Sequence, residues 1–231
     1  MGLLKRVFGP GHNEVWEELS NDIGAKFTKG GFFKGSSRVE AKIENWIIEL
    51  DTFTISTGKS SATYTRARAR FISKERFHFT IYRKGLLSAV GKFLGMQDVE
   101  VGGPRFERLE PLFGLPGYID PQIIESGDPG FDEQFIIKGN DEQKIRALFK
   151  RVKIRDLIQH QPSIMLQIRN IKEKPVKGKW RITCELYFQE TGVIKDKERL
   201  KRLFELFAEM LKAMRSLNIA TQARMPKDRR G

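Results

Sequence analysis

Residues 39–83 read VEAKIENWIIELDTFTISTGKSSATYTRARARFISKERFHFTIYR. Apolar and charged residues alternate over residues 39–43, and longer runs rich in β-branched and aromatic residues cover 46–56, 63–72 and 76–83. Such runs are typical of strands. Only short polar segments separate them, whereas parallel strands need crossovers of about a dozen residues or more. We therefore predict an antiparallel meander of four strands.

The chain after residue 130 predicts further strands and helices. A strand is expected at residues 134–138, and a helix begins near Asp141. A second helix is expected to end before Pro162, because proline cannot continue a helix interior. Runs of strand-forming residues at 164–171 and 180–189 predict a hairpin. Both halves of the chain thus combine strands with helices.

Two further helices show a clear helical period. The first is expected after an Asn13 N-cap, with acidic residues near its positive end. The second is expected from Asp196, and a wide apolar stripe predicts that it packs on a sheet. That stripe comprises Leu200, Leu203, Phe204, Phe207, Met210, Leu211, Met214 and Leu217. The predicted fold class is α+β, an antiparallel sheet with a long C-terminal helix packed on it, with two similar α+β subdomains as one arrangement.

Glycine and proline are concentrated in the middle of the chain, which is typical of an ordered connection. On this basis we expect five segments. They are an apolar and basic N-terminal segment (1–12), an α+β subdomain containing the meander (13–101), a Gly/Pro-rich connection (102–130), a second α+β subdomain (131–220) and a flexible basic tail (221–231).

The composition indicates a basic, soluble, globular protein. The 231 residues include 42 Lys and Arg against 29 Asp and Glu, a formal charge of +13, which favours anionic partners. No apolar run reaches the roughly 20 residues that span a bilayer. The single cysteine, Cys184, excludes an intramolecular disulfide and any multi-thiolate metal site within one chain. We expect a cytoplasmic protein, either free or peripheral to the inner face of the membrane.

An arginine row is the main candidate site. Side chains alternate across a strand, so Arg66, Arg68 and Arg70 share one face at a spacing of about 6.6–6.8 Å. The following strand is expected to add polar and aromatic side chains beside them, which suits phosphates and stacked bases. The predicted anion-binding or nucleic-acid-binding residues are Arg66, Arg68, Arg70, Arg76, His78 and Tyr82.

The alternative is that acids neutralise this row. Glu49 and Asp51 alternate onto one face of the preceding strand. Pairs of this kind contribute little to stability but cancel much of the electrostatic field. The charge pattern alone favours the paired or solvated face over a binding face.

A second candidate surface is a membrane contact at the N-terminus. Basic residues beside short apolar stretches hold proteins at anionic bilayers. The residues concerned are Leu3, Leu4, Lys5, Arg6 and Phe8, and the apolar segment 86–96 follows a basic pair in the same way. The alternative, which the short length of both stretches favours, is that they dock on the core or on a partner subunit.

No catalytic or metal-binding residues are predicted. The string Thr57-Gly58-Lys59-Ser60 has Phe53 where a phosphate-binding loop needs glycine, and it is expected to join two antiparallel strands. The acids near residues 128–142 suit turns and helix caps better than a metal. The three histidines are dispersed and Cys184 fits a small core position, so no cofactor is expected. The sequence favours a non-catalytic protein, although a site built from distant residues is not excluded by it.

Several short strings carry a resemblance to other sequences. They are Trp16, Ile23-Gly24-Ala25, Leu50-Asp51-Thr52, Ser56-Thr57-Gly58, Tyr64-Thr65-Arg66, Gly127-Asp128-Pro129-Gly130-Phe131-Asp132, Phe135-Ile136-Ile137-Lys138-Gly139-Asn140-Asp141 and Ile154-Arg155-Asp156-Leu157-Ile158. With these strings the chain resembles a loose group of uncharacterised bacterial proteins with no assigned activity. The resemblance implies a bacterial, single-unit protein and carries no mechanism.

Taken together, these observations favour a non-catalytic interaction or scaffold module with a basic surface. Two alternatives stay open. One is binding of nucleic acid or another polyanion through the arginine-lined sheet face, and the other is peripheral association with an anionic membrane. The expected partner is an unidentified protein or a polyanion, and no specific small molecule is predicted.

Overall fold

The computed structural model describes residues 11–31, 35–56, 61–73, 75–85, 122–176 and 179–221, with the backbone alone described for 172–176 and 179–181. The predicted N-terminal membrane contact, the 57–60 turn, the 86–96 segment, most of the Gly/Pro-rich connection and the tail after residue 221 lie outside these residues. The described helices are α2 (His12–Asp22), α5 (Pro129–Gln134), α6 (Glu142–Phe149), α7 (Val152–Gln159) and α8 (Lys197–Ser216). The described strands are β1 (Lys26–Thr28), β2 (Arg38–Ile43), β3 (Trp46–Ser56), β4 (Ser61–Ser73), β5 (Phe79–Arg83), β6 (Gln122–Ile123), β7 (Phe135–Gly139), β8 (Met165–Val176) and β9 (Lys179–Thr191).

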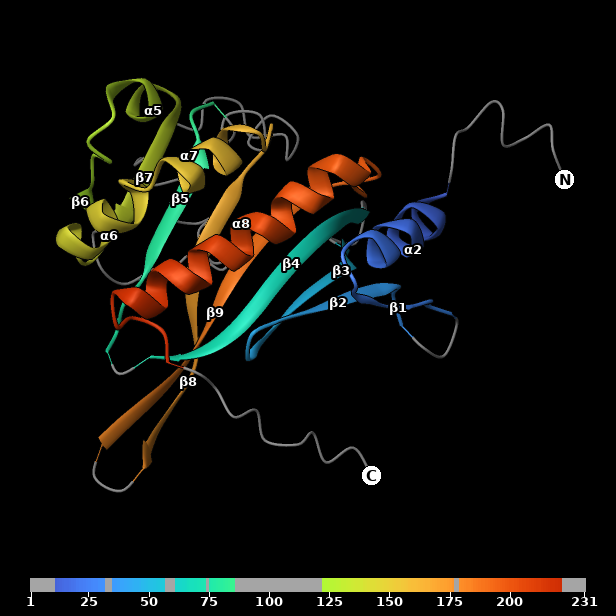
Figure 1. Ribbon diagram of the computed structural model, residues 1–231, viewed down its shortest axis with the longest axis horizontal. Coiled ribbons are helices and arrows are strands. Elements are labelled where there is room, and N and C mark those ends of the chain that lie inside the picture. Colours follow the sequence, from blue (N-terminus) through green and yellow to red (C-terminus); the bar gives the residue numbers. More distant parts are fainter. Residues whose placement is uncertain are drawn as a thin grey trace, which may run out of the picture.

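The nine described strands form one sheet, in the order β1-β2-β3-β4-β9-β8-β5-β7-β6 (Figure 1). Neighbouring strands pair antiparallel throughout. Together with a long C-terminal helix on the sheet, this confirms the predicted α+β fold class. Strands from before and after the Gly/Pro-rich connection are interleaved, because β9 and β8 lie between β4 and β5.

The predicted four-strand meander is correct for β2, β3 and β4 and wrong for β5. Strand β5 pairs with β8 and β7 instead of with β4. The partner of β4 is β9, over the register from Thr65↔Glu190 to Ser73↔Ile182. A hairpin to the five-residue β5 would have covered much less of the long strand β4, which explains why the distant strand wins.

Asn140 and Gly139 fix the segment that leads into β5. The Asn140 Oδ1 atom accepts from the His78 backbone N–H at 3.0 Å, and its Nδ2 atom donates to the Arg76 carbonyl oxygen. A Cβ atom at Gly139 would lie 2.7 Å from the His78 carbonyl oxygen, so only glycine permits this approach. These contacts direct the chain away from β4 and toward β7.

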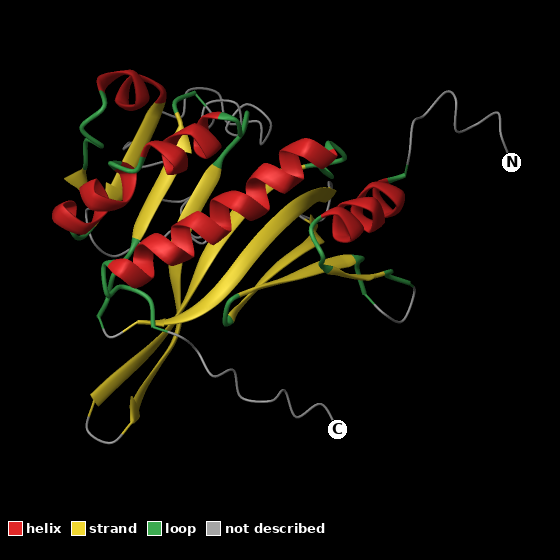
Figure 2. Cartoon of the chain, in the orientation of Figure 1, coloured by secondary structure: helices red, strands yellow, loops and turns green. Residues whose placement is uncertain are grey.

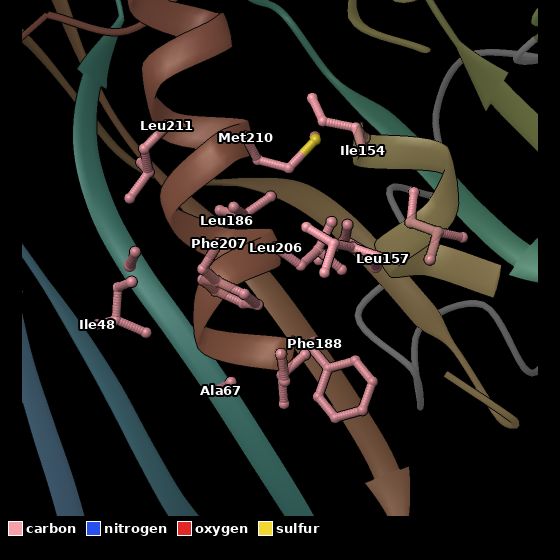
Figure 3. Packing of buried hydrophobic residues seen from close by; sticks show 14 of the residues in the cluster. Ile48, Ala67, Ile154, Leu157, Leu186, Phe188, Leu206, Phe207, Met210 and Leu211 are labelled. Atoms are coloured by element: carbon pink, nitrogen blue, oxygen red, sulfur yellow. The ribbon is translucent and has the colours of Figure 1, made fainter. Parts of the chain in front are cut away.

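The described helices form a second layer on one face of the sheet, which we call the helix face (Figures 1 and 2). Helix α8 runs across β4 and β9, and the predicted apolar stripe is buried from Leu200 to Met214, whereas Leu217 is the C-cap and is partly buried. Figure 3 shows Leu206 and Met210 of α8 next to Leu157 and Ile154 of α7, with Phe207 above the sheet. Removing one such buried leucine side chain costs about 2–5 kcal/mol, so this layer is the main source of stability.

One of the two predicted helix caps is correct, that of Asp141 at the start of α6. Asp141 and Asp196 cap α6 and α8, and each side chain accepts a backbone N–H at 3.0 Å. The predicted Asn13 cap is wrong, since Gly11 is the N-cap of α2 and no side chain caps it. Helix α2 is instead anchored by its buried face, where the Trp16 indole N–H donates to the Ile194 carbonyl oxygen at 3.0 Å.

The short helix α5 was expected to be a turn. Its N-cap, Asp128, accepts the Phe131 backbone N–H at 3.0 Å and pairs with Arg155 of α7 at 2.9 Å. Asp132 accepts the Ser126 backbone N–H at 2.8 Å. The strings that carry the resemblance at 127–132 and 154–158 are therefore in contact through the Asp128–Arg155 ion pair, which links α5 to α7. Among the described helices, none combines the length and apolarity needed to cross a membrane.

Candidate functional site

Strand β4 divides its side chains between two faces of the sheet. Ala67 and Ala69 are buried on the helix face, where their small size lets α8 approach the sheet (Figure 3). Arg66, Arg68 and Arg70 occupy the alternate positions on the opposite face. We call this opposite face, as formed by β3, β4, β9 and β8, the arginine face.

Two of the three arginines are held by carboxylates from β3. The Arg66 guanidinium donates to both Asp51 oxygens, each at 2.7 Å. Arg68 donates to Glu49 at 2.8 Å and to Asp51 at 3.2 Å. The hydrogen bonds to Asp51 raise the pKa of Arg66. Asp51 is only 8% exposed, against 23% and 20% for Arg66 and Arg68, so it lies at the centre of a charge network.

Arg70 is less constrained than the other two. Its Nε atom lies 3.7 Å from Glu185 of β9, beyond a good hydrogen bond, and its side chain is 48% exposed. Burial raises the pKa of Glu185 and outweighs the lowering effect of the nearby arginines, Arg68 first among them. Glu185 therefore protonates more readily than an ordinary glutamate, and Arg70 is the guanidinium of this row that is most available to a ligand.

Aromatic rings lie on the same face. The half-buried rings of Phe53 and Tyr64 stack with centroids 5.3 Å apart, and the Arg66 guanidinium lies 4.9 Å from the Phe53 centroid. The Arg169 guanidinium lies 3.2 Å from the centre of the Tyr187 ring. Burial raises the pKa of Tyr187 and lowers that of Arg169, which places this pair deeper than the row on β4.

The other three predicted site residues do not lie beside the arginines. Arg76 is exposed in the segment before β5, and His78 is buried there, which lowers its pKa. Tyr82 lies on β5, separated from β4 by β9 and β8, and is 1% exposed. The expectation that they flank the arginine row is wrong, because it depended on a β4–β5 hairpin.

Sequence reasoning missed the contribution of β8 and β9 to this face. The register places Glu185 opposite Arg70 and Tyr187 opposite Arg68. On the other side of β9, Arg169 lies opposite Glu185. Strand alternation in 182–189 indicated that Glu185 and Tyr187 share a face, but no local signal indicated that this strand lies next to β4. The expected pairing of Arg66 and Arg68 with Glu49 and Asp51 is found.

The arrangement can hold an anion by charge and hydrogen bonding. Each arginine has five N–H donors, and the carboxylates take two from Arg66, which leaves at most three for a ligand. Within the described ranges, no three His, Cys, Asp or Glu side chains are grouped as metal ligands. No family model, curated protein or solved structure gives a significant match to the chain.

Proposed function

We propose that this protein is a non-catalytic binding protein for single-stranded nucleic acid, which it contacts through the arginine face. The observation that carries the proposal is the row Arg66, Arg68 and Arg70 beside the stacked rings of Phe53 and Tyr64, on a sheet face that no described helix covers. Proteins that bind single strands combine a positive track for the backbone with aromatic rings on which bases stack. Both parts are present here.

The carboxylates orient the arginines as well as neutralising them. A bidentate pair such as Arg66–Asp51 holds the guanidinium in one plane, so less side-chain entropy is lost when a ligand binds. The same pairing weakens the field of the row. We therefore expect moderate affinity with steep salt dependence, supported by the formal charge of +13 over the full chain. The proposed location is the bacterial cytoplasm.

The first test is a salt titration of binding by the full chain. The probes are a fluorescent mixed-sequence single strand, a duplex of the same sequence and polyglutamate. We expect the single strand to bind most tightly, with log K falling linearly against log salt concentration, because bound cations are released from the phosphates. Equal and weak binding of all three probes would overturn the proposal. Binding to anionic vesicles without binding to the single strand would instead favour the membrane alternative.

The second test concerns the aromatic pair. Replacing Phe53 and Tyr64 together with alanine is expected to weaken single-strand binding by about 1–3 kcal/mol for each stacked base lost. Duplex binding is expected to change little, since paired bases are not available for stacking. The control is Ile47→Ala, which removes an exposed apolar side chain of β3 without removing a ring.

A further inference from the structure

The outer end of the β8–β9 hairpin leaves the sheet. The β4–β9 pairing ends at Ser73↔Ile182, and β5 pairs with β8 only from Met165 to Gln167. Farther out, β8 and β9 pair only with each other in the described part of the chain, and Figure 1 shows this end projecting past the other strands. We call its residues, 172–176 and 179–181, the basic ribbon.

The register of the basic ribbon separates two kinds of residue. Cross-strand partners share a face, and consecutive residues alternate between faces. One face therefore holds the pairs Lys172↔Thr183, Lys174↔Arg181 and Val176↔Lys179. The other face holds Glu173↔Ile182 and Pro175↔Trp180. Four cationic residues thus occupy the first face, and the one acid of the ribbon lies on the second.

The cationic face of the ribbon continues the arginine face. Thr183 lies two residues from Glu185 on β9, so the two occupy the same face of the sheet. Arg181 and Lys179 follow at the same two-residue spacing. From Gln189, the position opposite Arg66, to Lys179, this track along β9 spans ten residue steps, which corresponds to about 33 Å.

The two parts of this track differ in their acids. In the sheet, Glu49, Asp51 and Glu185 lie among the arginines. In the ribbon, no position of the cationic face is acidic, since the other two residues of the three pairs are Val176 and Thr183. The charge that attracts a polyanion is therefore concentrated in the ribbon instead of in the arginine row.

We propose that the basic ribbon is the principal phosphate-binding element of this protein, with Lys172, Lys174, Lys179 and Arg181 contacting the backbone of the single strand. This inference rests on the proposed function. It assigns the main electrostatic contribution to nucleic-acid binding to the basic ribbon instead of to the arginine row on β4. Cations on a polyanion-binding protein act by releasing the condensed counterions of the phosphates. The register of the projecting ribbon places four such residues on one face, with no acidic residue at the paired positions of that face.

The continuity of the cationic face with the arginine face favours nucleic acid over a bilayer. Pro175, Trp180 and Ile182 are on the face opposite the cations. An amphipathic segment in a membrane interface also separates its cations from its apolar residues, so this separation is shared by both kinds of partner. The cationic face, however, is continuous with the one that carries the Phe53–Tyr64 stack, where bases are expected to bind.

The test compares two variants of equal charge in the full chain. The ribbon variant is Lys172→Gln, Lys174→Gln, Lys179→Gln and Arg181→Gln. The control variant is Arg146→Gln, Lys153→Gln, Lys212→Gln and Arg215→Gln, which removes four half-exposed cations from the helix layer. At 0.1 M salt we expect the ribbon variant to lose about 100-fold or more in affinity for the single strand, and the salt slope to fall by about 2–3. The control variant is expected to lose less than tenfold.

The outcomes separate this inference from the proposed function. If the ribbon and control variants bind equally well while the wild-type chain binds the single strand, the inference is overturned and the proposed function stands. If the wild-type chain does not bind the single strand, both are overturned. Ribbon-dependent binding to phosphatidylglycerol vesicles but not to the single strand overturns both in favour of a membrane. A further variant, Lys172→Arg, Lys174→Arg and Lys179→Arg, alters the same positions but keeps the charge. We expect it to retain binding to the single strand, which shows that the glutamine variant loses affinity because charge is lost and not because the ribbon misfolds.

Discussion

The centre of the arginine face and the basic ribbon place similar charges on the same face of the sheet, yet their surroundings differ. At the centre, Asp51 holds Arg66 and Arg68 within hydrogen-bond distance. On the cationic face of the ribbon, no register position is acidic. The difference teaches that a row of arginines indicates a binding surface only when the neighbouring strand is known, because the neighbour decides whether each cation is structural or available.

The contrast predicts its largest effect for loss of the central arginines. Arg66→Gln with Arg68→Gln leaves Asp51 buried without a cation, so we expect a loss of about 2–4 kcal/mol in the free energy of unfolding. This corresponds to a fall in Tm on the order of 5–10 °C, measurable by calorimetry. The ribbon variant is expected to unfold within about 0.5 kcal/mol of the wild type. If the variant with Arg66→Gln and Arg68→Gln instead loses a hundredfold in affinity for the single strand with no change in Tm, the central arginines are the binding element and the contrast is wrong.

A second substitution removes the acid instead. Asp51→Asn takes the negative charge from two arginines, and we expect the free energy of unfolding to fall by about 1–3 kcal/mol because charged hydrogen bonds are lost. Affinity for the single strand is expected to rise by about three- to tenfold, since the freed guanidinium groups meet the phosphates. Calorimetry and anisotropy on the same sample check both signs. A fall in affinity would show that Asp51 mainly orients the arginines.

Arg70 is intermediate between the paired arginines at the centre of the face and the cations of the ribbon. Its pairing distance to Glu185 is long and its side chain is half-exposed. We therefore expect Arg70→Gln to lower affinity about threefold to tenfold and to change the free energy of unfolding by less than about 0.5 kcal/mol. The matched comparison is Arg66→Gln, for which the order of the two effects is expected to reverse. Identical results for the two variants would remove the distinction within the row.

The smallest expected effect is a pH dependence that comes from Glu185. Its pKa is raised in the folded chain by burial, so it takes up a proton at a higher pH than it does when unfolded. The contribution of Glu185 to the free energy of unfolding is therefore fully present below the ordinary pKa of glutamate. It is lost as the pH rises through the raised pKa of Glu185 in the folded chain. When Glu185 is protonated, Arg70 loses this anionic partner, so affinity for the single strand is expected to rise about two- to threefold as the pH falls through the raised pKa of Glu185.

The Glu185→Gln variant provides the control for this pH effect. It is expected to bind more tightly than the wild type at pH 7 and to lack this part of the pH dependence. His78 has the opposite sign, because burial lowers its pKa and its contribution to stability is lost on acidification. The free energy of unfolding must therefore be measured at each pH. A Glu185→Gln variant with the same pH profile as the wild type would contradict the assignment.

The sequence was sufficient to predict what each strand places on its two faces but not which strands are neighbours. Alternation in β4 correctly separates the three arginines from Ala67 and Ala69, and the local context of Asp141 correctly identifies it as a helix cap. The place of β5 was predicted incorrectly, since pairing over a long register outweighs a short connection. Glu185 could not be assigned to the site for the same reason. Side-chain chemistry is local, whereas the choice of a β partner is decided by the whole sheet.

The insertion of β8 and β9 between β4 and β5 also bears on how the chain folds. A nascent chain that ends before β8 contains two sheet fragments, β1–β4 and β5–β7–β6, whose facing edges have no partner yet. Contacts as distant in sequence as Ser73 and Ile182 form slowly because the intervening loop must first close. Until then the long edge of β4 is exposed to pairing with other chains. The β8–β9 hairpin completes the sheet, so the risk of aggregation is greatest until the chain has been synthesised as far as Thr191, the end of β9.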